Sequence, residues 1–328
     1  MIPPPPAAPT DLADPGVASR LGSRGPLAYA RRIAAVLGEV LPALIADFFS
    51  PRGDPILRWQ EGLAPGDGRR IALYRAEGFC IVLISVSPNV GEEDWQAGRA
   101  DTALVVHRRN RGRDFGAWRD LIGPALARWP AAEEMLLVND SVLGPIAPLA
   151  PVFAALRTGG DGVFGLLESL GAGAHLQSNF LLARGARAIA DIAGFLRAMR
   201  PSRSKWLIVQ RGELALAPWL RARGHRVAAL FPYAAVAASA LRDPAERDAL
   251  RTRMGAGELG ELLMRHPLNP AHFFWRVLPR LGCPFIKTEL IRNNPWGLPG
   301  LDAWPSLVPP DAPCPADLLA GHLRAMGG

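Results

Sequence analysis

Cys80-Ile81-Val82-Leu83-Ile84-Ser85-Val86 is a nearly continuous apolar run. Such a run is typical of a parallel strand covered on both faces, because a strand with one face in water alternates apolar and polar residues. Similar runs follow at 102–107 and 134–138, and a helical pattern covers 114–128 between them. This alternation of strands and helices predicts an α/β domain with a mostly parallel sheet flanked by helices.

The alternation continues on both sides of this segment. The remaining expected elements are an amphipathic helix at 26–49, a weak strand at 55–59, a helix at 68–77, strands at 162–167, 176–182 and 226–231, and helices at 185–199, 213–223, 243–264 and 270–281. We therefore expect a tail with an accessory N-terminal helix over 1–52, the α/β domain over 53–240, and a C-terminal helical cap with a tail over 241–328.

The chain has 328 residues, a net charge of +7 and a pI near 10.1. Only Lys205 and Lys287 are lysines, and the arginines that supply the remaining positive charge are scattered. Nucleic-acid-binding proteins gather their basic residues on one face, so no nucleic-acid partner is expected. Sugar phosphates or anionic lipid headgroups explain the positive charge equally well.

The sequence carries no recognisable signal for export or membrane insertion. The three cysteines, Cys80, Cys283 and Cys314, lack the paired spacing of a disulfide framework or a zinc site. The N-terminus has no basic region followed by an apolar one, and no window reaches the ~18 to 20 apolar residues that span a bilayer. We expect a cytoplasmic protein, with peripheral contact at the inner face of the membrane left open.

The first polar segment, RNRGRDFGAW at 109–118, follows the strand at 102–107. Asn110, Arg113 and Asp114 lie there beside two glycines that allow close backbone approach. Arg113 can hold a phosphate with two parallel hydrogen bonds. Asp114 can cap the following helix, whose free N–H groups attract an anion. A simple N-cap and an exposed arginine are the competing interpretations.

The second polar segment, Asn139-Asp140-Ser141, follows the strand at 134–138. Mg²⁺ and Mn²⁺ take oxygen ligands and bridge diphosphate oxygens, so Asp140 can support a metal. A turn is the competing interpretation, since turns favour these three residue types. Loops that follow parallel strands converge at one edge of a sheet, so the two polar segments are expected to be neighbours in a nucleotide-sugar site.

A third group of polar residues begins just before the expected strand at 176–182 and continues into it. His175, Gln177 and Asn179 alternate in sequence, and alternate residues of a strand point to the same face. A polar face on an otherwise apolar sheet indicates a site for sugar hydroxyls. A histidine hydrogen-bonded within the core is the competing interpretation.

Together these segments resemble the rhamnan synthesis protein F family, which is glycosyltransferase-like. The resemblance covers residues 55 to 295 approximately and is carried by NRGRDFGAW at 110–118, NDSVLGP at 139–145, HLQSNF at 175–180, Gly212-Glu213, Asn269-Pro270 and PFIKTEL at 284–290. It implies a GT-A-like, Rossmann-like domain that transfers rhamnose or a related sugar during cell-surface polysaccharide synthesis. The single carboxylate at 139–141 departs from the Asp-x-Asp motif common in GT-A enzymes, which puts metal dependence in doubt.

The resemblance also directs attention to residues later in the chain. Glu213 is expected to begin a helix, where a carboxylate meets the positive end of the helix dipole. Inverting transfer needs a base near the acceptor hydroxyl, and Glu213 is the candidate, with Asp161 and Glu168 as alternates. An ordinary preference for helix starts is the competing interpretation of Glu213. Lys287 is expected to contact phosphate, and His266 to supply a metal or diphosphate contact.

The sequence thus predicts an inverting glycosyltransferase with a nucleotide-diphosphate sugar donor, for which dTDP-rhamnose is a candidate, and a glycan or lipid-linked acceptor. The expected residues are Glu213 and Asp140 for catalysis; Asn110, Arg113, Asp114, Asn139, Ser141 and Lys287 for the donor; His175, Gln177 and Asn179 for the acceptor or sugar; and Asp140 and His266 for Mg²⁺ or Mn²⁺. The alternative is a non-catalytic carbohydrate- or partner-binding module that keeps a glycosyltransferase-like fold.

Overall fold

The computed structural model describes residues 56–61, 69–86, 92, 96, 102–255 and 257–325. These residues form two compact units. Unit 1 contains residues 136–182 together with the described residues from 226 onward, and unit 2 contains the described residues up to 135 together with 183–225. The expected tail and accessory helix over 1–52 lie outside the described residues. The expected domain boundaries at 53 and 241 stay a prediction.

Unit 2 contains a three-stranded sheet in the order β1 (Ile56–Glu61), β3 (Leu104–Arg108), β2 (Val82–Ser85). β2 runs parallel to β3, as the apolar run at 80–86 predicts, whereas β1 is antiparallel to β3. Helix α2 (Arg69–Ala76) precedes β2. Leu104 and Val106 of β3 form a buried cluster with Leu121.

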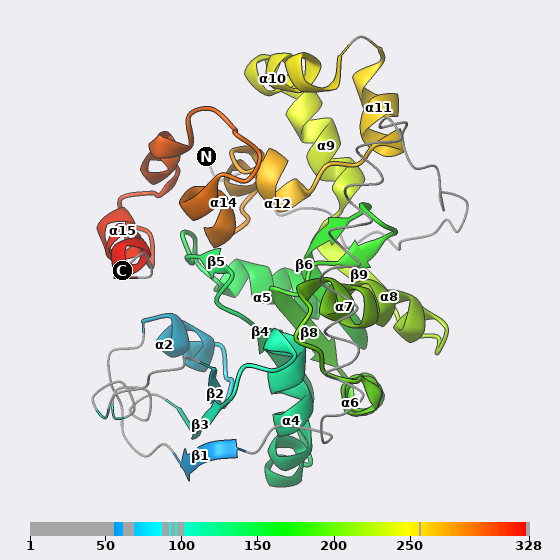
Figure 1. Cartoon of the computed structure of the whole chain (residues 1–328), viewed down its shortest axis with the longest axis vertical. Coiled ribbons are helices and arrows are strands. Elements are labelled where there is room, and N and C mark those ends of the chain that lie inside the picture. Colours follow the sequence, from blue (N-terminus) through cyan, green and yellow to red (C-terminus); the bar gives the residue numbers. More distant parts are fainter. Residues whose placement is uncertain are drawn as a thin grey trace. The chain divides into compact units, whose positions relative to one another are not determined.

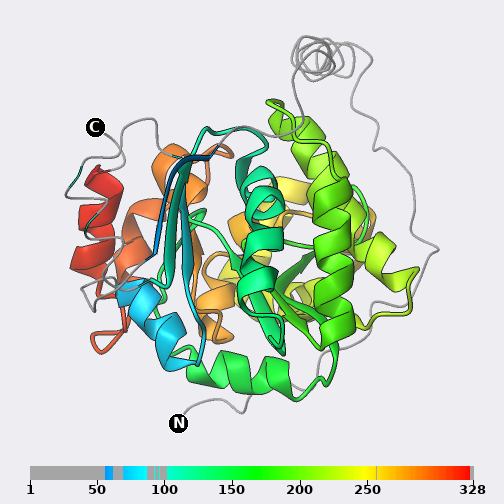
Figure 2. The same cartoon turned by 90° about the horizontal axis from the view of Figure 1, so that it is seen from below.

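Helices α4 (Arg113–Arg128) and α6 (Ala186–Ala198) of unit 2 pack side by side (Figure 2). The start of α4 is fixed by internal packing. Arg108 is 1% exposed, forms an ion pair of 2.8 Å with Asp120 and donates to the Arg111 carbonyl. A Cβ atom at Gly116 would lie 2.1 Å from that carbonyl oxygen, so only glycine fits there. The glycines at 112 and 116 therefore let segments of unit 2 pack closely.

Three helical segments of unit 2 follow one another without interruption. They are α7 (Lys205–Ile208), the π-helical η2 (Val209–Glu213) and α8 (Leu214–Arg221). The Ser204 hydroxyl caps the first segment by accepting a hydrogen bond from the Leu207 N–H at 3.3 Å. The sequence predicts only the part that begins at 213, so the actual helical run starts about two turns earlier.

A five-stranded sheet, most of whose residues belong to unit 1, has the order β4 (Glu134–Val138), β8 (Phe180–Arg184), β6 (Gly162–Ser169), β7 (His175–Leu176), and β9 (Val227–Phe231) also pairs with β6. β6 and β9 are parallel and lie side by side in Figure 1. β7 is antiparallel to β6. Every residue of β6 and β9 is buried, which accounts for the mostly apolar sequences of these strands.

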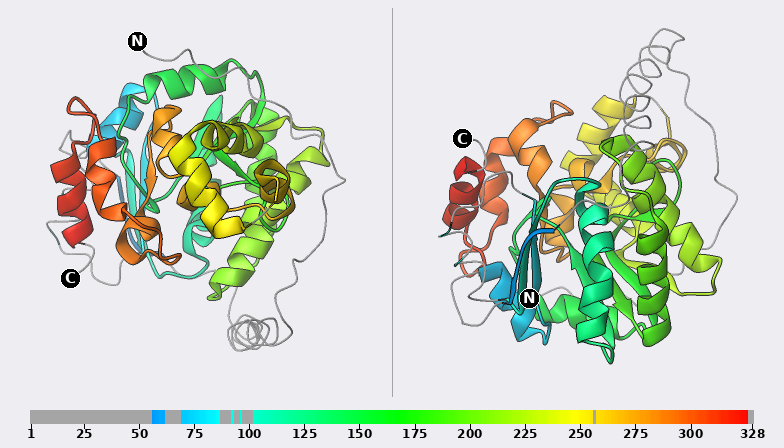
Figure 3. Two further views of the ribbon diagram at one scale, coloured as in Figure 1. Left: turned by 90° about the horizontal axis from the view of Figure 1, so that it is seen from above. Right: turned by 60° about the horizontal axis from the view of Figure 1, so that its bottom comes forward.

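The remaining elements of unit 1 are mostly helical. They are α5 (Ala150–Arg157), α9 (Tyr233–Arg242), α10 (Pro244–Met254), α11 (Leu259–Arg265), α12 (Pro270–Phe273), α13 (Val277–Arg280), α14 (Thr288–Asn293), the 3-10 helix η3 (Leu301–Leu307) and α15 (Ala316–Ala325). Helices α9, α10 and α11, in yellow shades in Figure 3, pack against one another. β5 (Val142–Leu143) pairs antiparallel with β10 (Ile286–Lys287).

The expected α/β class is confirmed, but the single mostly parallel sheet is wrong. The described strands form three sheets, and β3 and β4 belong to different ones. Apolar runs reveal that strands are buried, but they do not determine which strands pair, so the sequence could not show this division. Among the described helices, none combines the length and apolar character that crossing a bilayer requires.

Candidate functional site

The polar residues of unit 1 gather where β4 ends and β8 begins. An ion pair of 2.9 Å between Glu134 and Arg184, which both belong to unit 2, joins the first residue of β4 to the last residue of β8. The end of β4 therefore lies beside the start of β8. Asn139-Asp140-Ser141 follows β4, and Asn179 precedes β8.

Lys287 extends this cluster through a chain of hydrogen bonds. Its ammonium donates to the Ser141 hydroxyl at 3.0 Å. That hydroxyl donates to Asn139 Oδ1 at 2.6 Å, and the Ser141 N–H donates to the same oxygen at 3.1 Å. The turn interpretation of residues 139–141 is therefore confirmed, because the Asn139 side chain folds back onto its own backbone. This turn also gives the Lys287 ammonium a fixed partner.

The backbone holds this arrangement in register. Lys287 pairs with Val142 in the antiparallel ribbon of β10 and β5. Beyond it, the Thr288 N–H donates to the Ser141 carbonyl at 3.0 Å, and the Thr288 hydroxyl donates to the Asp140 carbonyl at 3.4 Å. Two segments 146 residues apart in the sequence thus form one site, which confirms that Asn139, Ser141 and Lys287 lie together.

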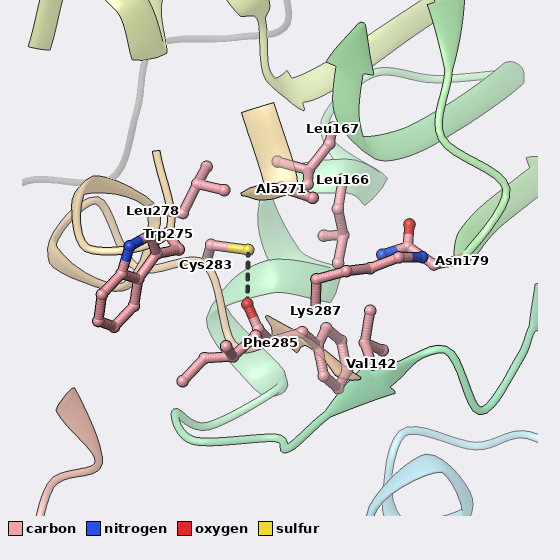
Figure 4. Close-up of a pocket in the computed structure, with 11 residues that line it drawn as sticks. Val142, Leu166, Leu167, Asn179, Ala271, Trp275, Leu278, Cys283, Phe285 and Lys287 are labelled. Carbon is pink, nitrogen blue, oxygen red and sulfur yellow. Dashed lines mark hydrogen bonds between the residues drawn. The ribbon is translucent and has the colours of Figure 1, made fainter. Parts of the chain in front are cut away.

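Lys287 and Asn179 both line one small cavity of unit 1, whose residues are drawn in Figure 4. The other lining residues are mainly apolar: Val142, Leu166, Leu167, Ala271, Trp275, Leu278, Cys283, Phe285 and Ile286. Asn179 is 4% exposed, and its Oδ1 has no hydrogen-bond partner among the described residues. A buried acceptor without a donor costs about 1–3 kcal/mol, so a hydrogen-bond donor that reaches this oxygen would be bound favourably.

The cysteine in this cavity is not a nucleophile. Cys283 is buried, and its thiol donates to the Phe285 carbonyl at 3.7 Å, the dashed line in Figure 4. Burial raises the pKa of the Cys283 thiol to about 12. Since the thiolate is the reactive form, this buried thiol is inert near neutral pH, and no covalent step is assigned to Cys283.

His175 and Gln177 serve internal contacts. The expected alternation through Asn179 is wrong, because β7 ends at Leu176 and β8 begins at Phe180, which leaves 177–179 as a loop. His175 Nδ1 contacts the Gly173 carbonyl at 2.8 Å. Gln177 Nε2 donates to Asn269 Oδ1 at 2.9 Å, and the same oxygen caps α12 by accepting from the Ala271 N–H. The core interpretation therefore accounts for His175, and Gln177 fixes the start of α12.

The structure removes two of the candidate bases. Glu168 is 4% exposed, and its Oε2 accepts a hydrogen bond of 3.0 Å from the Tyr233 N–H. Asp161 precedes β6, whereas Glu168 is near the opposite end of this strand. Seven residue steps of extended chain separate them by about 23 Å. Glu168 is thus committed to holding α9, and Asp161 lies far from the polar loops that follow β6.

Asp140 remains accessible. Its side chain is exposed and makes no hydrogen bond within the described part of the chain, while its carbonyl accepts from Thr288. It directly precedes Ser141, the partner of Lys287. A carboxylate and an ammonium therefore stand at the same strand end of unit 1.

The expected environment of Glu213 is wrong. Glu213 lies within the continuous helical run over 205–221, eight residues after its first residue, so it does not meet the positive end of a helix dipole. A Cβ atom at the preceding Gly212 would lie 2.8 Å from the Phe115 ring. The π-helical turn thus brings its backbone against this ring, a tertiary contact that the local sequence pattern does not reveal.

The other expected donor residues also belong to unit 2. The N-cap of α4 is Gly112, with φ of 83°, and its helix start carries no side-chain cap, so Asp114 as the N-cap is wrong. Arg113 is exposed and adopts a φ of 50°, which is uncommon for a residue with a side chain. Asn110 is exposed as well. Asn110 and Arg113 are therefore accessible. Binding of the donor by Asn110, Arg113 and Asp114 together with Asp140 stays a prediction.

The residues expected to bind a divalent ion do not fit one. Among the described residues, no group of three or more His, Cys, Asp or Glu side chains is placed to hold a metal. His266 is exposed at the end of α11. The Lys287 ammonium contacts Ser141, so an ion bound by the 139–141 turn would face a positive charge. Two unit charges about 4 Å apart repel by about 4 kcal/mol near a protein surface, and a divalent ion doubles this cost.

No family model matches the chain, and no solved structure matches it. Two relatives named Virulence protein VirA, one from Vibrio anguillarum and one from its strain ATCC 68554 / 775, are each 26% identical to it over 207 residues. The aligned region covers 60% of this chain. The chain spans about 65% of the length of these relatives.

Proposed function

We propose that this chain is a GT-A-like glycosyltransferase that transfers a sugar from a nucleotide-diphosphate donor to a glycan acceptor with inversion. The observation that carries the proposal is the contact between Lys287 and Ser141 of the Asn139-Asp140-Ser141 turn, together with Asn179, which lines the same cavity as Lys287 and has a buried oxygen without a partner among the described residues. This arrangement offers a cation, a hydrogen-bond acceptor and an exposed carboxylate at one strand end. The sequence resemblance to the rhamnan synthesis protein F family supports the same activity.

Lys287 is assigned to the diphosphate. Breaking the bond between the sugar and the diphosphate leaves negative charge on the departing oxygen, which a preorganised cation stabilises. The hydrogen bond to Ser141 and the pairing of β10 with β5 hold the ammonium in place before the donor arrives. Charge-assisted contacts between ammonium and phosphate oxygens are among the stronger hydrogen bonds in proteins.

Asn179 and Asp140 are assigned to the sugars. The unpaired Oδ1 of Asn179 accepts a hydrogen bond from a hydroxyl of the donor sugar, because a hydroxyl supplies the donor that the buried oxygen lacks. The exposed Asp140 carboxylate accepts the proton of the acceptor hydroxyl as that oxygen attacks the anomeric carbon. The bond to the diphosphate breaks as the new glycosidic bond forms, and the diphosphate leaves against Lys287.

Removal of divalent cations is expected to leave donor binding and turnover unchanged within about twofold. The physical reason is that the Lys287 ammonium supplies the positive charge at the 139–141 turn and disfavours a divalent ion there. The measurement compares nucleoside diphosphate release with excess EDTA and with added Mn²⁺. A loss of activity in EDTA that Mn²⁺ restores would contradict this assignment of Lys287.

Isothermal titration calorimetry tests the proposed function itself. The full chain is titrated with dTDP, UDP and GDP sugars, and each donor that binds is then incubated with glycan acceptors to detect nucleoside diphosphate release. The proposal predicts saturable binding of at least one donor and release that depends on acceptor. Failure of every donor to bind would refute it and favour the non-catalytic carbohydrate- or partner-binding module.

A further inference from the structure

Trp296 of unit 1 is held at the tip of an ordered loop that follows α14. Asn294 closes this loop, because its side-chain amide donates to the Leu298 carbonyl at 2.9 Å and accepts from the Leu298 N–H at 2.8 Å. The Gly297 N–H adds a third bond, to the Asn294 carbonyl at 3.1 Å. Trp296 nevertheless stays 43% exposed. The loop therefore presents a large aromatic side chain to solvent in a fixed position.

The orientation of the indole ring is fixed as well. Its Nε1–H donates to Nδ1 of the buried His272 at 2.7 Å. The Phe273 ring packs beside it, with 5.3 Å between ring centroids. The Arg253 guanidinium lies 4.3 Å from the Phe273 centroid and 6.0 Å from that of Trp296. Three side chains from α10 and α12 thus support one exposed ring.

This aromatic cluster is connected to the candidate site through α12. His272 and Phe273 belong to α12, whose N-cap Asn269 accepts the hydrogen bond from Gln177. Gln177 is two residues before Asn179, which lines the cavity with Lys287. The same short helix therefore positions both the loop at 177–179 and the support of Trp296.

We infer that Trp296 and Arg253 form a binding site for a pyranose ring of the acceptor glycan. One face of a pyranose carries C–H groups that pack on an indole ring, while the hydroxyls on its rim accept hydrogen bonds from a guanidinium. Trp and Arg are also the residue types that contribute most at protein–protein interfaces. The indole ring of Trp296 is already held in place before binding, which lowers the conformational entropy lost when a ligand binds. This inference depends on the proposed glycosyltransferase function.

The test compares Trp296→Ala with Trp206→Ala, because Trp206 of α7 is 41% exposed and lies in unit 2. Acceptor dependence is measured by sugar transfer to a panel of soluble oligosaccharides, and donor affinity by calorimetry with the nucleotide sugar. Trp296→Ala is expected to raise the acceptor KM about tenfold, equivalent to about 1.4 kcal/mol, because it removes the ring on which the C–H face of the pyranose packs. Donor affinity is expected to stay unchanged, and Trp206→Ala should change neither quantity.

Two results would overturn the inference. An unchanged acceptor KM in Trp296→Ala would exclude the site, and a loss of donor affinity in that variant would assign Trp296 to the nucleobase.

Electrophoresis through gels that contain polysaccharides separates this inference from the proposed function. If no nucleotide sugar binds, the proposed function fails. If polysaccharide in the gel slows the wild-type chain but not Trp296→Ala, the glycan-binding site at Trp296 and Arg253 is still supported. Absence of retardation in the wild-type chain, together with absence of transfer, rejects both.

Discussion

Replacement of Lys287 by methionine is expected to lower the rate of sugar transfer about 10²- to 10³-fold, the loss seen when one preorganised donor to a developing negative charge is removed. Methionine keeps an unbranched apolar stem like that of lysine but lacks the terminal ammonium that contacts Ser141. The backbone pairing of residue 287 with Val142 does not depend on the side chain, so the fold should persist. Steady-state kinetics with the nucleotide sugar, together with circular dichroism, measure the two effects.

The chain offers a matched control, because Lys205 is its other lysine. Lys205 is exposed at the start of α7 in unit 2. Lys205→Met removes the same charge from the whole protein and should leave transfer unchanged within about twofold, as surface charges screened by salt contribute little. Equal losses in both variants would indicate a general electrostatic effect. A fully active Lys287→Met enzyme would contradict the role of Lys287.

Replacement of Asn179 by leucine is expected to change stability and binding in opposite directions. The buried Oδ1 has no partner in the described part of the structure, and its removal should stabilise the folded chain by about 1–3 kcal/mol. The same change removes the acceptor for a sugar hydroxyl, so the donor KM should rise about tenfold. Thermal unfolding and steady-state kinetics measure these effects on one preparation.

Gln177→Leu provides the comparison, since Gln177 is similarly buried but its amide donates to Asn269. This variant removes a satisfied hydrogen bond and should lower the melting temperature. Asn179→Leu should raise it. If Asn179→Leu instead destabilises the chain as Gln177→Leu does, the asparagine has a structural role and its assignment to a sugar hydroxyl is wrong.

The apolar runs allowed most strands to be predicted. The expected strands at 80–86, 134–138 and 226–231 correspond closely to β2, β4 and β9. The short ribbon of β5 and β10 was not expected, because two-residue strands carry no periodicity. This ribbon is nevertheless what brings Lys287 to Ser141. The sequence could indicate both segments through their unusual polar residues, but the contact between them depends on tertiary pairing.

The errors concern residues whose environment depends on packing. Glu213 is expected from the sequence to begin a helix, but the helical run over 205–221 extends through Gly212 and Glu213, and Gly212 packs against Phe115 of α4. Gly116 reads as a place for a ligand, whereas the Arg111 carbonyl occupies the space that a side chain would need. In both cases glycine permits a close contact within the protein, and sequence alone does not distinguish this use from ligand binding.

The most direct test is a crystal structure of the chain with the nucleoside diphosphate of a donor that binds in calorimetry. The account predicts a diphosphate oxygen about 2.7–2.9 Å from the Lys287 ammonium, the usual length of a charge-assisted hydrogen bond. A diphosphate that is well ordered elsewhere, with Lys287 contacting only Ser141, would contradict the proposed site.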